Sequence, residues 1–84
     1  MKDIEFGSIR IKLDEVMEKQ NISINKLAFR SEMQRTQLKA YRDNKVQRID
    51  LSVLSRLCFA LDCDLFELIE YIPPHPPKNE DTND

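Results

Sequence analysis

One stretch constrains the fold of this chain more than any other: residues 27–45, which read LAFRSEMQRTQLKAYRDNK. The spacing of its apolar residues predicts two short helices, 24–30 and 34–43, separated by a three-residue turn. The second helix packs on its neighbour through only Leu38 and Tyr41, so most of its polar and basic surface stays uncovered. Two short helices joined so tightly are typical of a helix-turn-helix unit.

Length and composition allow one domain with a modest core. The chain has 84 residues, of which 40% are hydrophobic and 33% charged, as in a folded globular protein. Its single Gly leaves no material for a phosphate-binding loop, and its single histidine, His75, lies in the segment PPHPP. No carboxylate pair or nucleophile–base pair is brought together by the sequence. We therefore expect no enzyme activity, no catalytic residue, no metal site and no cofactor.

Three further helices are predicted around the central pair. The first covers 13–20, the fourth covers 51–61 after the N-cap Asp50, and the fifth covers 65–72 after the N-cap Asp64. The fourth helix has the apolar spacing of a buried face, with inward positions at Leu51, Leu54, Leu57, Cys58 and Leu61. Together these elements predict an all-α bundle of five helices.

The segment before the first helix allows two interpretations. Ile9 and Ile11 alternate with charged residues, which suits a short strand at 9–12. Ile9 also fits the apolar face of the first helix, which would then begin earlier. We favour the strand. If it pairs with Tyr71 and Ile72, the two segments form a two-stranded accessory sheet.

The ends of the chain differ from its middle. Residues 1–8 are expected to be a flexible arm, 9–72 the domain, and 73–84 a disordered, Pro-rich acidic tail. The N-terminus lacks the apolar core of a signal peptide, and no apolar run approaches the roughly 20 residues that span a bilayer. A cytoplasmic protein without membrane contact is expected. The spacing of Cys58 and Cys63 matches neither a redox pair nor a zinc site, so both are interpreted as core thiols.

Charge is distributed unevenly along the chain. The net charge is −2, but residues 24–56 hold eight Lys or Arg against three acids, a local charge of +5. Residues 57–72 hold four acids and no base. A basic segment between acidic ends indicates a local site for a polyanion, because the local field governs docking more than the total charge.

The second helix of the central pair offers candidates for DNA recognition. Those for reading base edges lie on its N-terminal and uncovered positions: Gln34, Arg35, Thr36, Lys39 and Ala40. Those for contacting phosphates lie around it: Ser23, Arg42, Lys45 and Arg48. The alternative interpretation is a solvated helix face, and composition and spacing alone leave both open.

The order and spacing of these elements resemble the Cro/phage-repressor helix-turn-helix family, also called XRE. The resemblance covers about Ile11 to Ile72 and rests on Leu27-Ala28, on Met33 at the turn, and on Leu38 and Tyr41. It implies a lambda-repressor-like fold and a homodimer that inserts helix 34–43 into successive major grooves of double-stranded DNA. By resemblance, the base-reading positions are Arg35, Thr36 and Ala40, with Gln34 and Lys39 beside them, and the phosphate-contacting positions are Ser23, Lys45 and Arg48.

Two positions depart from the family pattern. Glu32 stands where the turn usually has Gly, and a left-handed non-Gly residue costs about 1–2 kcal/mol. The turn could therefore take another geometry and change the angle of the reading helix. Asp43-Asn44 replaces the family's Asn-Gly, so we expect Asn44 to take the backbone role of the Gly. Asp43 stands where the family has Asn, so we expect weaker or differently angled contact with the DNA backbone at this position.

These observations predict a sequence-specific transcriptional regulator, most simply a homodimeric repressor of an inverted-repeat operator. The alternative is an antitoxin-like or adaptor module that uses the same fold to bind a protein through the C-terminal helix 65–72. That segment carries Phe66, Ile69, Tyr71 and Ile72, which self-association would also cover. Exposure of the basic side chains without acidic partners favours DNA; pairing with acids favours the adaptor.

Overall fold

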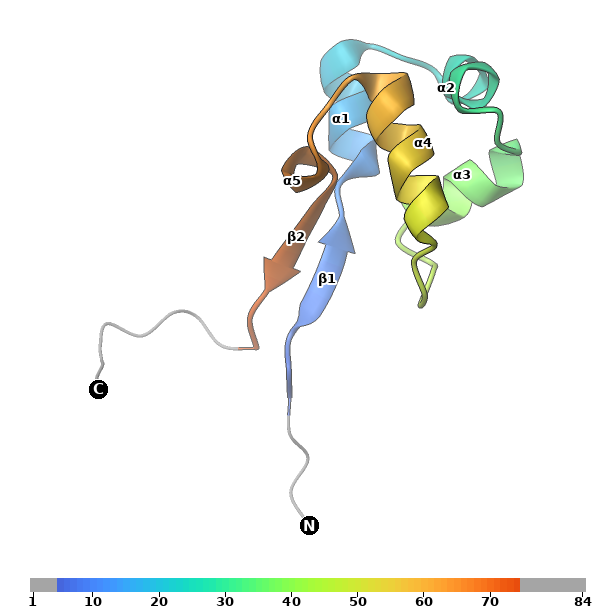
Figure 1. Cartoon of the computed structure of the whole chain (residues 1–84). Coiled ribbons are helices and arrows are strands. Elements are labelled where there is room, and N and C mark those ends of the chain that lie inside the picture. The colour runs from blue at the N-terminus through green and yellow to red at the C-terminus, as the bar shows by residue number, and fades with distance from the viewer. Residues whose placement is uncertain (1–4, 75–84) are drawn as a thin grey trace.

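The computed structural model describes residues 5–74, and the predictions for residues 1–4, for His75 and for the rest of the tail lie outside this range. The elements follow one another as β1 (Ser8–Ile11), α1 (Leu13–Gln20), α2 (Ile24–Ser31), α3 (Arg35–Arg42), α4 (Leu51–Leu61), α5 (Leu65–Leu68) and β2 (Ile69–Ile72). The helices gather at one end, and the two strands lead away from them side by side (Figure 1). The predicted five-helix architecture and its accessory strand pair are confirmed.

The C-terminal helix is shorter than predicted. Helix α5 ends at Leu68, and the chain becomes extended at Ile69, with φ −136° and ψ 154°. The prediction of a helix over 65–72 was therefore wrong beyond Leu68. Strand β2 instead pairs antiparallel with β1, with Ile11 opposite Ile69 and Ile9 opposite Tyr71. Branched and aromatic side chains favour such cross-strand pairs, whereas a helix extended through 72 would leave β1 without a partner.

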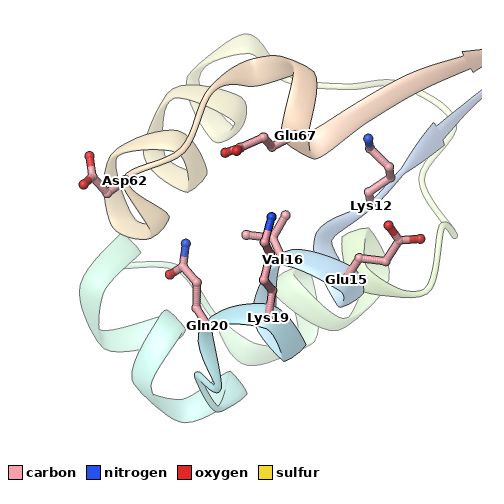
Figure 2. A pocket seen from close by; sticks show the side chains of 7 residues that line it. All are labelled: Lys12, Glu15, Val16, Lys19, Gln20, Asp62 and Glu67. Atoms are coloured by element: carbon pink, nitrogen blue, oxygen red, sulfur yellow. The ribbon is translucent and has the colours of Figure 1, made fainter.

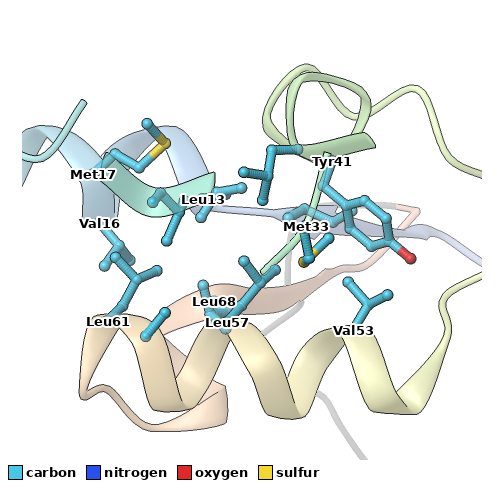
Figure 3. Packing of buried hydrophobic residues seen from close by; sticks show 13 residues of the cluster. Leu13, Val16, Met17, Met33, Tyr41, Val53, Leu57, Leu61 and Leu68 are labelled. Carbon is cyan, nitrogen blue, oxygen red and sulfur yellow. The ribbon is translucent and has the colours of Figure 1, made fainter. Parts of the chain in front are cut away.

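The core is built from leucines contributed by every helix. The largest fully buried side chains are Leu13, Leu27, Leu38, Leu57, Leu61 and Leu68. Met33, in the α2–α3 turn, joins them, and the cluster fills the space between α1, α3 and α4 (Figure 3). The six leucines hold the helices against one another, so the position of α3 depends on this single core.

One core prediction for α4 is wrong. Leu51 is 77% exposed, and Val53 is buried in its place, pointing into the same part of the core as Tyr41 (Figure 3). Leu57 lies at the centre of the inward face of α4. At about 100° per residue, Leu51 falls on the outer side of the first turn while Val53 falls within about 40° of Leu57.

The helix ends follow the sequence signals. The side chains of Ser23 and Asp50 accept hydrogen bonds from Lys26 N–H and Ser52 N–H, and Asp64 forms a capping box with Glu67. The hydrogen bonds from Ser52 lower the pKa of Asp50. Within residues 5–74, no helix is long and apolar enough to cross a membrane.

The two cysteines are free thiols packed against the core. Cys58 and Cys63 are both half-buried and contact the main cluster without forming a disulfide. Burial, followed by the neighbouring Cys58, raises the pKa of Cys63 to about 11. Both residues thus behave as the core thiols expected from their spacing.

The glycine at position 7 serves the sheet. Gly7 has φ +85°, and a Cβ on it would collide with the backbone carbonyl oxygen of Ile72. The Tyr71 hydroxyl donates a hydrogen bond to the Phe6 carbonyl at 2.7 Å, which ties the same end of the strand pair. Only glycine combines this backbone conformation with so close an approach.

Candidate nucleic-acid interface

Helix α3 is held by two side chains and exposes the rest. Leu38 is fully buried and Tyr41 is 4% exposed, and both belong to the main core. The exposed residues at and after the helix start are Gln34, Arg35, Thr36, Gln37 and Lys39. Ala40 and Arg42 are half-buried. The candidate base-reading side chains thus lie on or beside the uncovered surface of α3, with Gln34 as its N-cap residue.

The α2–α3 turn keeps the left-handed geometry despite its missing Gly. Glu32 has φ 56° and ψ 44°, and its N–H donates to the carbonyl of Ala28. Arg56 of α4 supports this turn, because its Nη1 donates to the carbonyl oxygens of Ser31 at 3.0 Å and Glu32 at 3.3 Å. These bonds satisfy carbonyls at the end of α2 that the helix leaves open. The turn geometry left open by the sequence is therefore the one that a Gly would adopt.

Arg56 therefore has a structural role at the α2–α3 turn. Sequence reasoning counted its charge in the basic segment, but its guanidinium is directed to the end of α2. No local pattern signals this role, since Arg56 lies 25 residues from Ser31. Its charge contributes less to the outer surface than the count of residues 24–56 implies.

A side chain of α2 holds Arg35. The Nη1 of Arg35 donates to Oδ1 of Asn25 at 3.0 Å, joining the first turn of α3 to the first turn of α2. Among the described residues, the other guanidinium nitrogens of Arg35 have no side-chain partner. This contact limits the rotamers of a candidate base-reading residue. Sequence reasoning missed Asn25, whose role depends on how the two helices pack.

The end of α3 carries an internal ion pair. Arg42 donates to Asp43 through Nε to Oδ1 at 3.0 Å and through Nη2 to Oδ2 at 3.4 Å. These bonds and the opposite charge raise the pKa of Arg42 and lower the pKa of Asp43. Asp43 therefore orients Arg42. Arg42 already shares its guanidinium with a carboxylate, which weakens it as a phosphate contact.

Asn44 joins the end of α3 to the sheet. Its φ is 59°, so it takes the backbone role expected for the family's Gly. Its side-chain amide also accepts from Ile11 N–H at 2.7 Å and donates to the Ile11 carbonyl at 2.9 Å. The amide thus pairs with β1 as a neighbouring strand would. This second role was not visible in the sequence, because Asn44 and Ile11 are 33 residues apart.

The remaining phosphate-contact candidates flank α3. Ser23 caps α2, where its Oγ accepts from Lys26 N–H at 3.1 Å, so its hydroxyl hydrogen remains available to a second acceptor. Lys45 and Arg48 are exposed in the segment between α3 and α4. Among the candidate residues, Arg35, Lys39, Lys45 and Arg48 are exposed and form no ion pair in the described part of the chain. The same holds for Lys19, Lys26, Arg30 and Arg56, which lie on the other helices.

A separate hollow lies between α1 and α5. Its volume is about 300 Å³, and it is lined by side chains of both charges, including Lys12, Lys19 and Glu67 (Figure 2). The Gln20 amide there donates to the Leu61 carbonyl at 2.7 Å. The lining presents no nucleophile beside a base and no dominant charge. We therefore assign no ligand to it, and the candidate interface remains the surface of α3.

Comparison with known proteins agrees with this geometry. The family model for the Cro/C1-type helix-turn-helix DNA-binding domain matches residues 12–74. Among solved structures, the transcriptional regulator VanUg, Form II, is similar with a TM-score of 0.61 and 21% sequence identity. The alignment covers 87% of this chain and 99% of that chain, and at this identity it bears on the fold. Comparison with curated protein sequences gives no match.

Proposed function

The chain belongs to the family of Cro/C1-type helix-turn-helix DNA-binding domains, and on this premise we propose that it is a sequence-specific transcriptional repressor. It binds an inverted-repeat operator as a homodimer, with α3 of each copy in the major groove. Repression follows from occlusion of the promoter by the bound dimer. Such a regulator acts in the cytoplasm, where it meets its operator.

The exposed, cationic surface of α3 carries this proposal. Arg35 can donate two hydrogen bonds to guanine, and Asn25 limits the directions in which its guanidinium points. Thr36 and Ala40 can contact thymine methyl groups, while Gln34 and Lys39 supply further donors at the same face. A helix fixed by Leu38 and Tyr41 alone leaves these groups uncovered.

Phosphate contacts complete the proposed complex. Lys45 and Arg48 are exposed cations without carboxylate partners in the described structure, so they suit the phosphates beside the groove. Ser23 adds a hydroxyl at the start of α2. Arg42 contributes less than these residues because Asp43 already holds its guanidinium.

A protein-binding adaptor is the second candidate function. Four phenylalanines are strongly exposed, Phe6 before β1 and three on helices: Phe29 on α2, Phe59 on α4 and Phe66 on α5. Exposed aromatic side chains are typical of protein interfaces. This candidate predicts that a partner protein, rather than DNA, covers segment 65–72.

Selection from a randomised duplex library tests the proposal. We expect purified protein at moderate salt to enrich an inverted repeat whose half-sites lie one helical turn, about 34–36 Å, apart. Circular dichroism on the same sample verifies that the protein is folded. A folded protein that enriches no sequence would favour the adaptor.

A further inference from the structure

The outer edge of strand β1 carries unpaired backbone groups. The Lys12 N–H donates to the Leu68 carbonyl, so Lys12 and, by alternation, Arg10 and Ser8 direct their backbone groups toward β2. Ile11 directs its N–H and C=O to the opposite side, where the Asn44 amide accepts and donates. Ile9, two residues earlier, must face that same outer side. No side chain among the described residues pairs with its backbone, so its donor and acceptor remain open.

The open edge adjoins exposed apolar surface. Ile9 is 55% exposed and its cross-strand neighbour Tyr71 is 58% exposed. A groove of about 510 Å³ runs beside β1, where Ile9 meets Val46 and Ile49 of the segment before α4. An apolar groove along an open strand edge suits an added extended strand, whose main chain supplies the hydrogen bonds.

We propose that a second copy of this chain occupies this edge, with the two β1 strands pairing antiparallel about a twofold axis at Ile9. The proposal deepens the homodimer of the proposed function and rests on it. Ile9 and the partner's Ile9 then exchange both backbone hydrogen bonds, and the sheets join in the order β2, β1, partner β1, partner β2. The same residue offers one donor and one acceptor, so the contact is self-complementary, as a twofold interface requires.

The side chains agree with this register. Pairing at Ile9 places Arg10 opposite the partner's Ser8, so no like charges face each other across the axis. It places Ile11 opposite the partner's Gly7, and because the Asn44 amide already holds the outward groups of Ile11, the paired segment ends at Ser8 and Arg10. The Arg10 guanidinium already forms ion pairs within its own chain, with Glu15 at 2.8 Å and with Glu70 at 3.3 Å. A register centred on Arg10 is excluded because its backbone groups face β2, and one centred on Ile11 is blocked by Asn44. Ile9 is therefore the residue of β1 that can lie on the axis.

The interface would also border the DNA-binding surface. The segment that lines the groove through Val46 and Ile49 also holds Lys45 and Arg48, which we propose as phosphate contacts. Asn44 joins that segment to β1 directly. Pairing of two β1 strands would therefore set the spacing of the two reading helices.

Disulfide trapping tests the register. A hydrogen-bonded antiparallel pair holds its Cα atoms about 5.5 Å apart, which lies inside the range of a disulfide. We expect Ile9→Cys to give a covalent dimer under mild oxidation. Ser8→Cys is the matched control, because two such residues would lie roughly 8 Å apart along the paired strands, too far for a bond. Equal trapping of both variants, or of neither, would overturn the register.

Removal of the unpaired Ile9 N–H tests whether the outer edge of β1 forms the dimer interface. Ile9→Pro deletes the outward N–H while leaving the groups that face β2 in place, and proline is tolerated on an edge strand. By sedimentation velocity we expect a dimer for the wild type and for Ile9→Val, and a folded monomer for Ile9→Pro. A dimeric Ile9→Pro variant would overturn the proposal, as would a monomeric wild type. The sedimentation samples contain no DNA. If the wild type is a monomer in them but still selects an operator from the duplex library, this interface is overturned and the proposed DNA binding is not.

Discussion

The α2–α3 unit and the β1–β2 pair present opposite kinds of surface. Helix α3 is fixed by buried Leu38 and Tyr41 and exposes polar and cationic side chains. The strand pair exposes apolar side chains, Ile9 and Tyr71 among them, and leaves part of its backbone open. The first surface suits a polyanion and the second suits another polypeptide strand. One small core thus supports two surfaces of different chemistry.

Removal of an α3 anchor should have the largest effect. Leu38→Ala deletes a fully buried side chain and should lower the free energy of unfolding by about 2–5 kcal/mol. Urea denaturation followed by circular dichroism measures this change. Gln37→Ala, at the exposed neighbouring position, is the control and should stay within about 0.5 kcal/mol of the wild type. Equal losses in both variants would contradict the two-anchor description of α3.

The reading face should respond to Arg35 in a sequence-dependent way. Arg35→Ala should cost about 1–3 kcal/mol on the preferred site and relax specificity at one base position. Asn25→Ala should shift the same position more weakly, because it frees the guanidinium without removing it. Binding to a panel of single-base operator variants measures both effects. Uniform losses across the panel would reassign Arg35 to a phosphate contact.

Lys45 should behave differently from Arg35. Lys45→Ala should weaken all sites alike and reduce the salt slope of binding by about 0.9, the contribution of one phosphate contact. Titrations at several salt concentrations measure the slope. Lys19→Ala, a change on α1 beside the separate hollow, is the control and should leave the slope unchanged. A base-specific effect of Lys45→Ala would contradict its proposed role.

Substitution of the left-handed residue should have opposite effects on stability in the two regions. Glu32→Gly should stabilise the fold by about 1 kcal/mol, because Gly adopts φ 56° without strain. Gly7→Ala should destabilise the strand pair, because a Cβ there meets the Ile72 carbonyl. Thermal unfolding measures both changes. Glu32→Ala, which removes the side chain but not the strain, should not reproduce the gain.

The smallest expected effect concerns Cys63, near the point where the chain leaves α4 for α5. Its raised pKa of about 11 should keep the thiol protonated and slow to alkylate at pH 8 in the folded protein. Its stabilising contribution is present below the unfolded pKa of about 8.5 and is lost as pH rises toward 11. Alkylation rates in buffer and in urea measure this difference. A fast rate in buffer would indicate that this junction opens locally.

The sequence alone was sufficient for the local elements. Helix α1 begins and ends where its apolar period and Asn21 predict, and Ser23 and Asp50 cap the helices assigned to them. The anchors Leu38 and Tyr41 also follow from spacing alone. Period and capping act within a few residues, so a linear pattern records them.

Tertiary structure decided the features that join distant segments. Residues 69–72 form a strand because β1, about 60 residues away, offers a partner, and Glu32 keeps its left-handed turn with support from Arg56. The candidate site depends on the same kind of contact, as Asn25 holds Arg35 and Asn44 holds Ile11. Each bond joins groups 10 or more residues apart, so its partners meet only after the core has packed. Hydrophobic period therefore determines which helices form, and packing determines which polar side chains meet.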